Sequence, residues 1–127
     1  MIDNRIAIII VEDEPDTAEM FAEMMRLEGY NVLKSYGGEA AKELIEQCIP
    51  DLIILDIMMP DLSGLDVLRW MRGKEKLKNI ATVVVSAKSR PMDIKAGLAA
   101  GATVYLTKPI AYQELRDAVT QALALSA

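Results

Sequence analysis

Short, continuous apolar segments alternate along the chain with longer segments in which apolar residues recur at helical spacing. The apolar segments are rich in β-branched residues, as strands are, and they span residues 6–11, 31–36, 52–55, 81–85 and 103–106. Two of them, 6–11 and 52–55, contain no polar residue, which is typical of parallel strands buried on both faces. Lys34 and Ser35 interrupt the second segment, so we expect it at an edge of the sheet.

The intervening segments predict helices. The first is expected to begin at Pro15, because the fixed φ of proline suits the first helical position, and to end near Gly29. The apolar face of the second helix is expected to comprise Ala41, Leu44, Ile45 and Cys48. The fourth helix, at about 91–100, is expected to be weak, because a glycine such as Gly97 inside a helix costs about 1 kcal/mol relative to alanine.

Strands that alternate with helices predict right-handed crossover connections and a parallel sheet with helices on both faces. No linker, repeat or low-complexity stretch divides the sequence, so we expect one domain over residues 1–127. The predicted fold class is therefore α/β, a doubly wound five-stranded parallel sheet.

Charge and composition exclude several classes of function. The net charge of −5 repels a phosphate backbone, so we expect no direct nucleic-acid contact by this domain. With a single cysteine and no histidine, the chain forms no internal disulfide, no cysteine-based zinc site and no histidine-dependent active site. No apolar segment approaches the roughly 20 residues that span a membrane, and Asp3 and Asn4 stand where a signal peptide is basic. We expect a cytoplasmic protein.

Polar side chains follow four of the five expected strands. They are Glu12, Asp13 and Glu14 after the first strand, Asp56 after the third, Ser86 after the fourth and Lys108 after the fifth. Because the carboxyl ends of parallel strands meet at one edge of the sheet, where ligands bind, we expect these groups to lie close together.

Such a cluster suits phosphoryl transfer. Neighbouring carboxylates repel one another unless a cation relieves them, and Mg²⁺ is the natural cation because it prefers oxygen ligands. Asp56 can supply an attacking carboxylate oxygen, while Asp13 and Glu12 hold the metal. Lys108 and Ser86 would then pair the remaining phosphate oxygens.

Four segments resemble the signature segments of response-regulator receiver domains, the CheY-like family of two-component signal transduction. They read IIIVEDEP, DLIILDIMMPDLSG, VVVSA and GATVYLTKP. The resemblance runs the length of the chain in the family's order and spacing. It implies a doubly wound (βα)5, flavodoxin-like sheet of strand order 2-1-3-4-5, and a cis peptide bond between Lys108 and Pro109.

The resemblance also implies roles for individual residues. It assigns phosphorylation to Asp56 and catalysis to Ser86 and Lys108. The metal ligands would be Glu12, Asp13, Asp56 and the backbone carbonyl of Met58. Ser86 and Tyr105 would form the conformational switch. Glu12 stands where aspartate is commoner, and its longer arm leaves direct and water-mediated metal contact open. For Tyr105 the alternative to a switch is simple packing.

The resemblance implies a signalling switch. A sensor histidine kinase, a phosphotransfer domain or a small phosphodonor would phosphorylate Asp56 in the presence of Mg²⁺, and the product would bind an output partner differently. The domain would catalyse its own phosphorylation and dephosphorylation without being a conventional turnover enzyme. We expect the fourth helix, fifth strand and fifth helix to form the output face, and dimerisation through it stays open. A DNA-binding effector, a hybrid kinase and a stand-alone regulator are open alternatives for the output.

Nearby polar residues have simpler interpretations. We expect Glu14 to be a helix cap or a solvated carboxylate rather than a metal ligand, and Asp61 and Ser63 to serve the turn and the start of the third helix. Lys88 is expected to be a solvated charge. Met58 and Lys88, each two residues after a functional position, should also flank the path of water that hydrolyses the phosphoryl group.

The sequence disfavours two other classes of protein and leaves a third open. A flavodoxin-like electron carrier would need hydroxyl and glycine residues after the first strand, where this chain has Glu12-Asp13-Glu14. A dinucleotide enzyme would need G-x-G-x-x-G in the same loop, and the sequence has none. A receiver-shaped binding module that is not phosphorylated stays open, although such modules usually lose the acidic pair or the lysine.

Overall fold

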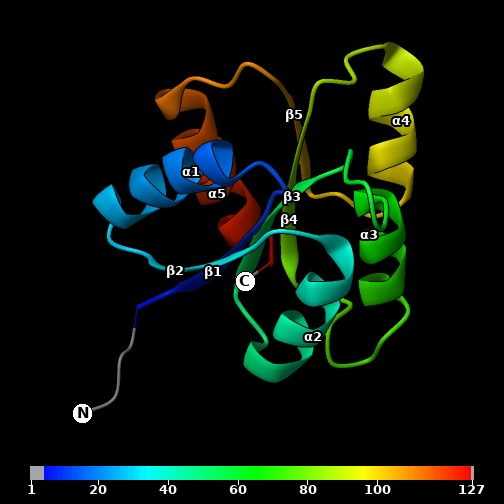
Figure 1. Cartoon of the computed structure of the whole chain (residues 1–127), viewed down its shortest axis with the longest axis horizontal. Coiled ribbons are helices and arrows are strands. Elements are labelled where there is room, and N and C mark those ends of the chain that lie inside the picture. The colour runs from blue at the N-terminus through cyan, green and yellow to red at the C-terminus, as the bar shows by residue number, and fades with distance from the viewer. Residues whose placement is uncertain (1–4, 127) are drawn as a thin grey trace.

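A computed structural model describes residues 5–126, and the predicted domain boundaries at 1 and 127, with Asp3 and Asn4, lie outside that range. Five strands and five helices alternate along the chain (Figure 1). The strands are β1 (Ala7–Val11), β2 (Asn31–Ser35), β3 (Leu52–Asp56), β4 (Ala81–Ser86) and β5 (Val104–Thr107). The helices are α1 (Pro15–Leu27), α2 (Gly38–Cys48), α3 (Gly64–Arg72), α4 (Pro91–Ala99) and α5 (Tyr112–Ser126).

The five strands form one parallel sheet of order β2-β1-β3-β4-β5, so the predicted strand order is confirmed. Helices α1 and α5 cover one face of the sheet, and α2, α3 and α4 lie on the other side (Figure 1). The order reverses direction after β2 and β1, and it therefore places the ends of β1 and β3 side by side at the centre of the carboxyl edge.

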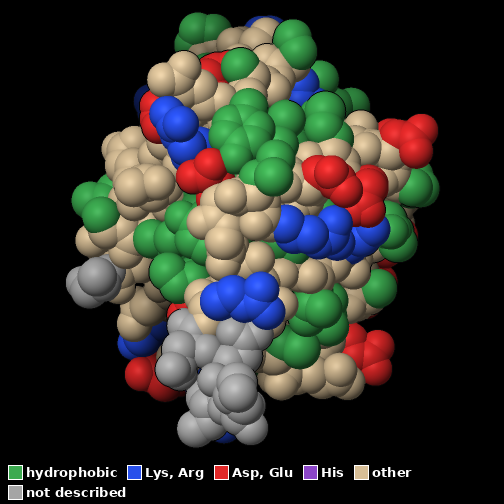
Figure 2. Space-filling view, turned by 90° about the vertical axis from the view of Figure 1, so that its left-hand side faces the viewer, with side chains coloured by type: hydrophobic (Ala, Val, Ile, Leu, Met, Phe, Trp, Pro, Cys, Tyr) green, Lys and Arg blue, Asp and Glu red, His purple; other side chains and the backbone are tan. Residues whose placement is uncertain are grey.

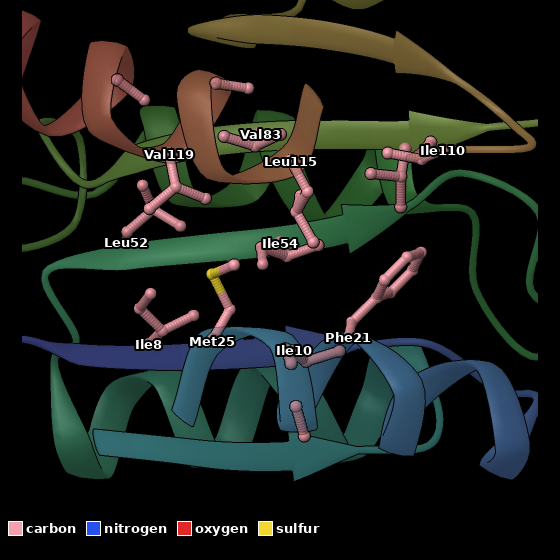
Figure 3. Packing of buried hydrophobic residues seen from close by; sticks show 14 of the residues in the cluster. Ile8, Ile10, Phe21, Met25, Leu52, Ile54, Val83, Ile110, Leu115 and Val119 are labelled. Atoms are coloured by element: carbon pink, nitrogen blue, oxygen red, sulfur yellow. The ribbon is translucent and has the colours of Figure 1, made fainter. Parts of the chain in front are cut away.

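The central strands are apolar because both of their faces are buried. Ile8 and Ile10 face α1 and α5, while Ile9 and Val11 pack with residues of α2 and α3, as the two-residue period of a strand requires. Figure 3 shows the first of these layers, in which Phe21 of α1 and side chains of α5 close over β1, β3 and β4. This two-sided core fixes the strand ends at which the polar residues emerge.

Some predicted strand ends and the position of Cys48 need correction. Strand β1 begins one residue later than predicted, at Ala7, and β2 ends one residue earlier, at Ser35. Strand β5 begins and ends one residue later than predicted, at Val104 and Thr107. Cys48, expected on the buried face of α2, is exposed. Cys48 is the last residue of that helix, and the chain turns away at Ile49 with a left-handed backbone (φ 41°), so the final helical turn is not covered.

Arg72, at the end of α3, ties together elements at the opposite end of the sheet from the polar residues. Its guanidinium donates hydrogen bonds to the carbonyls of Lys78, Ile80 and Gly101 and to the hydroxyl of Thr82, at 2.8–3.2 Å. Burial lowers the pKa of Arg72. These bonds fix the positions of α3, the start of β4 and the α4–β5 turn relative to one another.

Trp70 links α2 to α3. The ammonium of Lys42 on α2 lies 5.3 Å from the centre of the indole ring, and that of Lys74 lies 5.5 Å from it. Lys74 also approaches Glu46 of α2 at 3.9 Å. These contacts bridge the gap between two helices on one side of the sheet.

Figure 2 shows the side of the molecule that carries α1 and β2, where acidic and basic side chains lie among apolar ones. Glu19 of α1 pairs with Arg26 at 2.8 Å and with Lys34 of β2 at 3.1 Å. A charged residue on an edge strand discourages pairing with other chains. Across residues 5–126, each helix is too short or too polar to cross a lipid bilayer.

Candidate functional site

Strand β1 leads directly into the acidic loop of the site. The backbone N–H of Glu12 donates to the carbonyl of Ser35 at 3.0 Å, which continues the pairing of β1 with β2 by one residue. The carboxylate of Glu14 accepts the N–H of Asp16 at 2.9 Å, so the predicted helix cap is confirmed. This cap turns the chain into α1 and leaves Glu12 and Asp13 at the rim of the sheet.

Three carboxylates converge at this rim. Glu12, Asp13 and Asp56 each offer an oxygen, and these oxygens lie within 4.8 Å of one another. Glu12 and Asp56 are 1% and 4% exposed, and Asp13 is half-buried. Because close anionic oxygens are the donor set that Mg²⁺ prefers, the residues present fit the predicted metal.

Lys108 supplies positive charge to the same cluster. Its Nζ lies 2.7 Å from Oε1 of Glu12 and 3.5 Å from Oδ2 of Asp56. Burial disfavours the ammonium, but hydrogen bonding to Glu12 and the charge of Asp56 outweigh it, so the pKa of Lys108 is raised. The Lys108–Pro109 peptide is cis, as the family resemblance implied.

The loop after β3 closes tightly around Asp56. The N–H of Met58 donates to Oδ1 of Asp56 at 3.2 Å, and the N–H of Gly64 donates to the carbonyl of Ile57 at 2.8 Å. A side chain at Gly64 would collide with the backbone carbonyl of Asp56, so the start of α3 can approach only because this residue is glycine. The loop thus fixes the carboxylate of Asp56 through the N–H of Met58.

Ser86 and Tyr105 are connected through the backbone of Lys88. Ser86 is fully buried, and its hydroxyl oxygen accepts the N–H of Lys88 at 3.1 Å. The hydroxyl of the half-buried Tyr105 donates to the carbonyl of Lys88 at 2.8 Å, and burial raises the pKa of this phenol. The ring packs so closely on Gly97 that a Cβ there would lie 2.6 Å from it.

A shallow groove of about 410 Å³ opens beside the loop that follows β3. It is lined by Ile57, Met58, Met59, Pro60, Ser63 and Lys88. Met58 is 53% exposed, and it faces the same groove as Lys88 although 30 positions separate them in the sequence. Met58 and Lys88 therefore both border the open space beside the loop that follows Asp56.

One sequence interpretation is wrong, and it concerns Asp61. Ser63 does cap α3, because its hydroxyl oxygen accepts the N–H of Leu65 at 3.2 Å. Asp61 instead accepts the N–H groups of Gly38 and Glu39, at 3.1 and 3.0 Å, and so caps α2. The only signal in the sequence was the Gly37-Gly38 pair, which leaves α2 without a capping side chain of its own.

Comparison with known proteins agrees with the observed fold. A parallel sheet of order β2-β1-β3-β4-β5 with helices on both faces places the chain in the class of flavodoxin-like α/β domains. The response regulator receiver domain family matches residues 8–120, and the chain belongs to that family.

Individual relatives support the same assignment. The chain is 36% identical over 110 residues to "Probable transcriptional regulatory protein TcrX" of Mycobacterium tuberculosis, covering 87% of this chain and 46% of that protein. It is 32% identical over 104 residues to the polar-differentiation response regulator DivK of Brucella ovis, covering 82% and 85%. The chain thus spans about half the length of TcrX and most of DivK.

A solved structure shows the same fold. The signal receiver domain of a signal transduction histidine kinase from Syntrophus aciditrophicus superposes with a TM-score of 0.86 at 32% identity, covering 93% of this chain and 89% of that one. The three similar proteins include two regulators and a kinase, so the family occurs in proteins of different architecture.

Proposed function

We propose that this receiver domain accepts a phosphoryl group on Asp56 in a Mg²⁺-dependent reaction and thereby switches its binding to a partner. One observation carries the proposal: three carboxylates and the ammonium of Lys108 share a single, largely buried cluster at the carboxyl edge of the sheet. An arrangement that served only to stabilise the fold would not gather three acidic groups around one cation, because the excess negative charge is unfavourable there.

The donor we propose is a phosphohistidine of a sensor histidine kinase or phosphotransfer domain, or a small acyl phosphate. In the transfer, a carboxylate oxygen of Asp56 forms a bond to phosphorus while the bond from phosphorus to the histidine nitrogen breaks. The electron pair stays with the imidazole, which takes up a proton. The product is an aspartyl phosphate.

The chain contributes mainly positioning and charge to this step. The N–H of Met58 holds Oδ1 of Asp56, and the cation of Lys108 faces Oδ2. The hydroxyl of Ser86 accepts a hydrogen bond from Lys88, so its own proton is available for a phosphate oxygen. Bound Mg²⁺ would neutralise charge that the carboxylates and the phosphoryl group share. Glu12, Asp13, Asp56 and the carbonyl of Met58 would hold it.

The ion pair between Lys108 and Glu12 suggests how the cluster would respond to phosphorylation of Asp56. Its Nζ is 2.7 Å from Glu12 but 3.5 Å from Asp56, so the stronger ion pair is with the residue that is not the acceptor. A phosphoryl group on Asp56 adds up to about two negative charges. We propose that Lys108 then turns from Glu12 to the phosphoryl oxygens, and that Ser86 moves with its loop.

The output we propose is a change in the surface formed by α4, β5 and α5. Tyr105 of β5 is hydrogen-bonded to the carbonyl of Lys88, next to Ser86, and movement of Ser86 would therefore change the space available to the tyrosine ring. Coupling between such sites is typically worth about 1–3 kcal/mol. Because the relatives are regulators and a kinase, we propose that the output partner is a second domain or protein. A cytoplasmic location is part of the same proposal.

Incubation with acetyl phosphate and Mg²⁺, followed by intact-mass measurement, tests the proposal. We expect the wild-type chain to gain the mass of one phosphoryl group, and to gain none after the metal is chelated. Asp56→Asn should gain none, whereas Asp117→Asn, an exposed carboxylate of α5, should behave as the wild type. A gain of mass by Asp56→Asn would assign the reaction to another residue.

A further inference from the structure

The N-terminus of α2 is capped by a residue from a different loop. The first N–H groups of a helix have no partner within it, and Gly37, the residue that precedes α2, has no side chain to supply one. The carboxylate of Asp61 fills this role by accepting from Gly38 at 3.1 Å and from Glu39 at 3.0 Å. These two N–H groups, that of Glu39 foremost, lower the pKa of Asp61, as expected for a carboxylate at a helix N-terminus.

Backbone packing between the two loops is equally close. A Cβ on Gly38 would lie 2.7 Å from Cβ of Leu62 and 3.0 Å from its carbonyl oxygen. A Cβ on Gly37 would lie 3.1 Å from a carboxylate oxygen of Asp61. The approach of the two loops therefore requires glycine at position 38, whereas a side chain at position 37 would displace the carboxylate of Asp61 slightly. Asp61 lies at the point of contact.

Further hydrogen bonds connect this contact to the proposed metal ligands of both loops. On one side, the hydroxyl of Ser35 donates to the carbonyl of Gly37 at 3.2 Å, and the carbonyl of Ser35 accepts the N–H of Glu12 at 3.0 Å. On the other side, Asp61 belongs to the same loop as Met58, whose N–H is bonded to Asp56. A continuous series of hydrogen bonds and short loop segments thus connects the acidic loop after β1 with the acceptor loop after β3.

We propose that Asp61 is a positioning residue for the Mg²⁺ site: by anchoring the acceptor loop to the N-terminus of α2, it fixes the carbonyl of Met58 relative to Glu12 and Asp13. This inference rests on the proposed function, since it assumes that the rim binds the metal. Asp61 touches neither the metal nor the phosphoryl group. Its effect is on the affinity of the site for Mg²⁺ rather than on the chemistry of transfer.

The test measures Mg²⁺ affinity and phosphorylation separately in the whole chain. The dissociation constant for Mg²⁺ comes from a titration that follows backbone amide chemical shifts. The maximal phosphorylation rate comes from acetyl phosphate at saturating Mg²⁺. Asp61→Ala should weaken Mg²⁺ binding by about tenfold, the lower end of the effect of residues that orient a metal site, and leave the maximal rate at saturating Mg²⁺ within about twofold.

Two further variants separate positioning from folding. Asp61→Asn retains one acceptor oxygen and should recover part of the affinity. Gly38→Ala keeps the carboxylate but forces the loops apart, so it should weaken Mg²⁺ binding in the same direction as Asp61→Ala. Asp117→Ala is the matched control, and circular dichroism establishes that each variant is folded.

The outcomes distinguish the two proposals. If Asp61→Ala and Gly38→Ala both bind Mg²⁺ as tightly as Asp117→Ala does, Asp61 has no positioning role, whatever their melting temperatures. If the wild type binds Mg²⁺ but is not phosphorylated, the proposed function fails, while the affinities still decide the role of Asp61. If the wild type binds no Mg²⁺, both proposals are wrong.

Discussion

At the scale of single residues, some groups near Asp56 bind its carboxylate and others line the groove beside its loop. Met58 does both, because its backbone N–H binds the carboxylate while its side chain projects into the groove beside it. Lys88 lines the same groove. The lifetime of a phosphoryl group on Asp56 should therefore depend on how these two side chains admit an attacking water.

We predict that Met58→Asn accelerates dephosphorylation by about threefold to tenfold, equivalent to about 1 kcal/mol of activation free energy. The apolar thioether excludes water from the groove, whereas an amide can orient it. The decay of the phosphorylated species by intact mass gives the rate. Met92→Asn, a change at an exposed methionine of α4, should leave the rate unaltered. Equal rates for Met58→Asn and the wild type would contradict this role.

At the scale of helices and strands, the sequence was most informative where the determinants are local. Continuous β-branched segments predicted the strands, and the Glu14-Pro15 pair predicted the start of α1, because hydrophobic periodicity and caps involve neighbouring residues. The resemblance supplied the strand order and the cis peptide, which no local pattern encodes. The role of Asp61 was missed for the same reason, since its partners lie 22 and 23 positions away.

In the candidate site too, the sequence predicted which residues meet but not their detailed side-chain geometry. The sequence predicted that polar groups from several strand ends would meet, and Lys108 does lie beside Asp56. It did not predict that Glu12 would be the nearer partner of Lys108, because side-chain geometry at a crowded rim depends on burial and on every neighbouring charge. The exposure of Cys48 was likewise set by where α2 ends rather than by its helical face.

Helix α2 should lose stability when its cap is protonated. The folded-state pKa of Asp61 lies below the ordinary value of 3.8, so the stabilisation from its charge is complete above that value and is lost as the pH falls through the folded-state pKa. We predict that the wild type is more stable than Asp61→Asn at neutral pH, and that the difference narrows below pH 3.8. Urea unfolding across the pH range measures it. A gap that widened on acidification would contradict the assignment.

The glycine inside α4, Gly97, is in close contact with the ring of Tyr105. In an open helix, alanine would be more stabilising than glycine by about 1 kcal/mol. At Gly97, however, a methyl group would lie 2.6 Å from the ring of Tyr105. We predict that Gly97→Ala destabilises the fold by about 1–3 kcal/mol in urea unfolding, because overpacking forces the ring to move.

Two controls define this result. Gly73→Ala, at the end of α3, places its methyl group at ordinary contact distance and should be neutral or stabilising. In a Tyr105→Ala background, Gly97→Ala should lose most of its cost, since the clashing ring is gone. A Gly97→Ala variant as stable as Gly73→Ala would show that the ring tolerates the methyl group.

At the scale of the whole molecule, the site and the proposed output face lie on adjacent parts of one sheet. Ser86 and Tyr105 connect them through the backbone of Lys88. We predict that a phosphoryl mimic changes amide hydrogen exchange across residues 86–112, because the loop after β4 must rearrange around the new charge. Asp56→Asn should show no such change. Unchanged protection of this segment in the wild type would place the output elsewhere.

The contact of Trp70 with Lys42 and Lys74 gives the protein a built-in optical probe. Trp70 is the only tryptophan in the chain, and indole emission responds to the distance of nearby ammonium groups. Because Lys42 lies on α2, any shift of that helix relative to α3 would alter the brightness or colour of the emitted light. Ordinary fluorimetry on the unlabelled chain would thus report movement of α2 relative to α3 in real time.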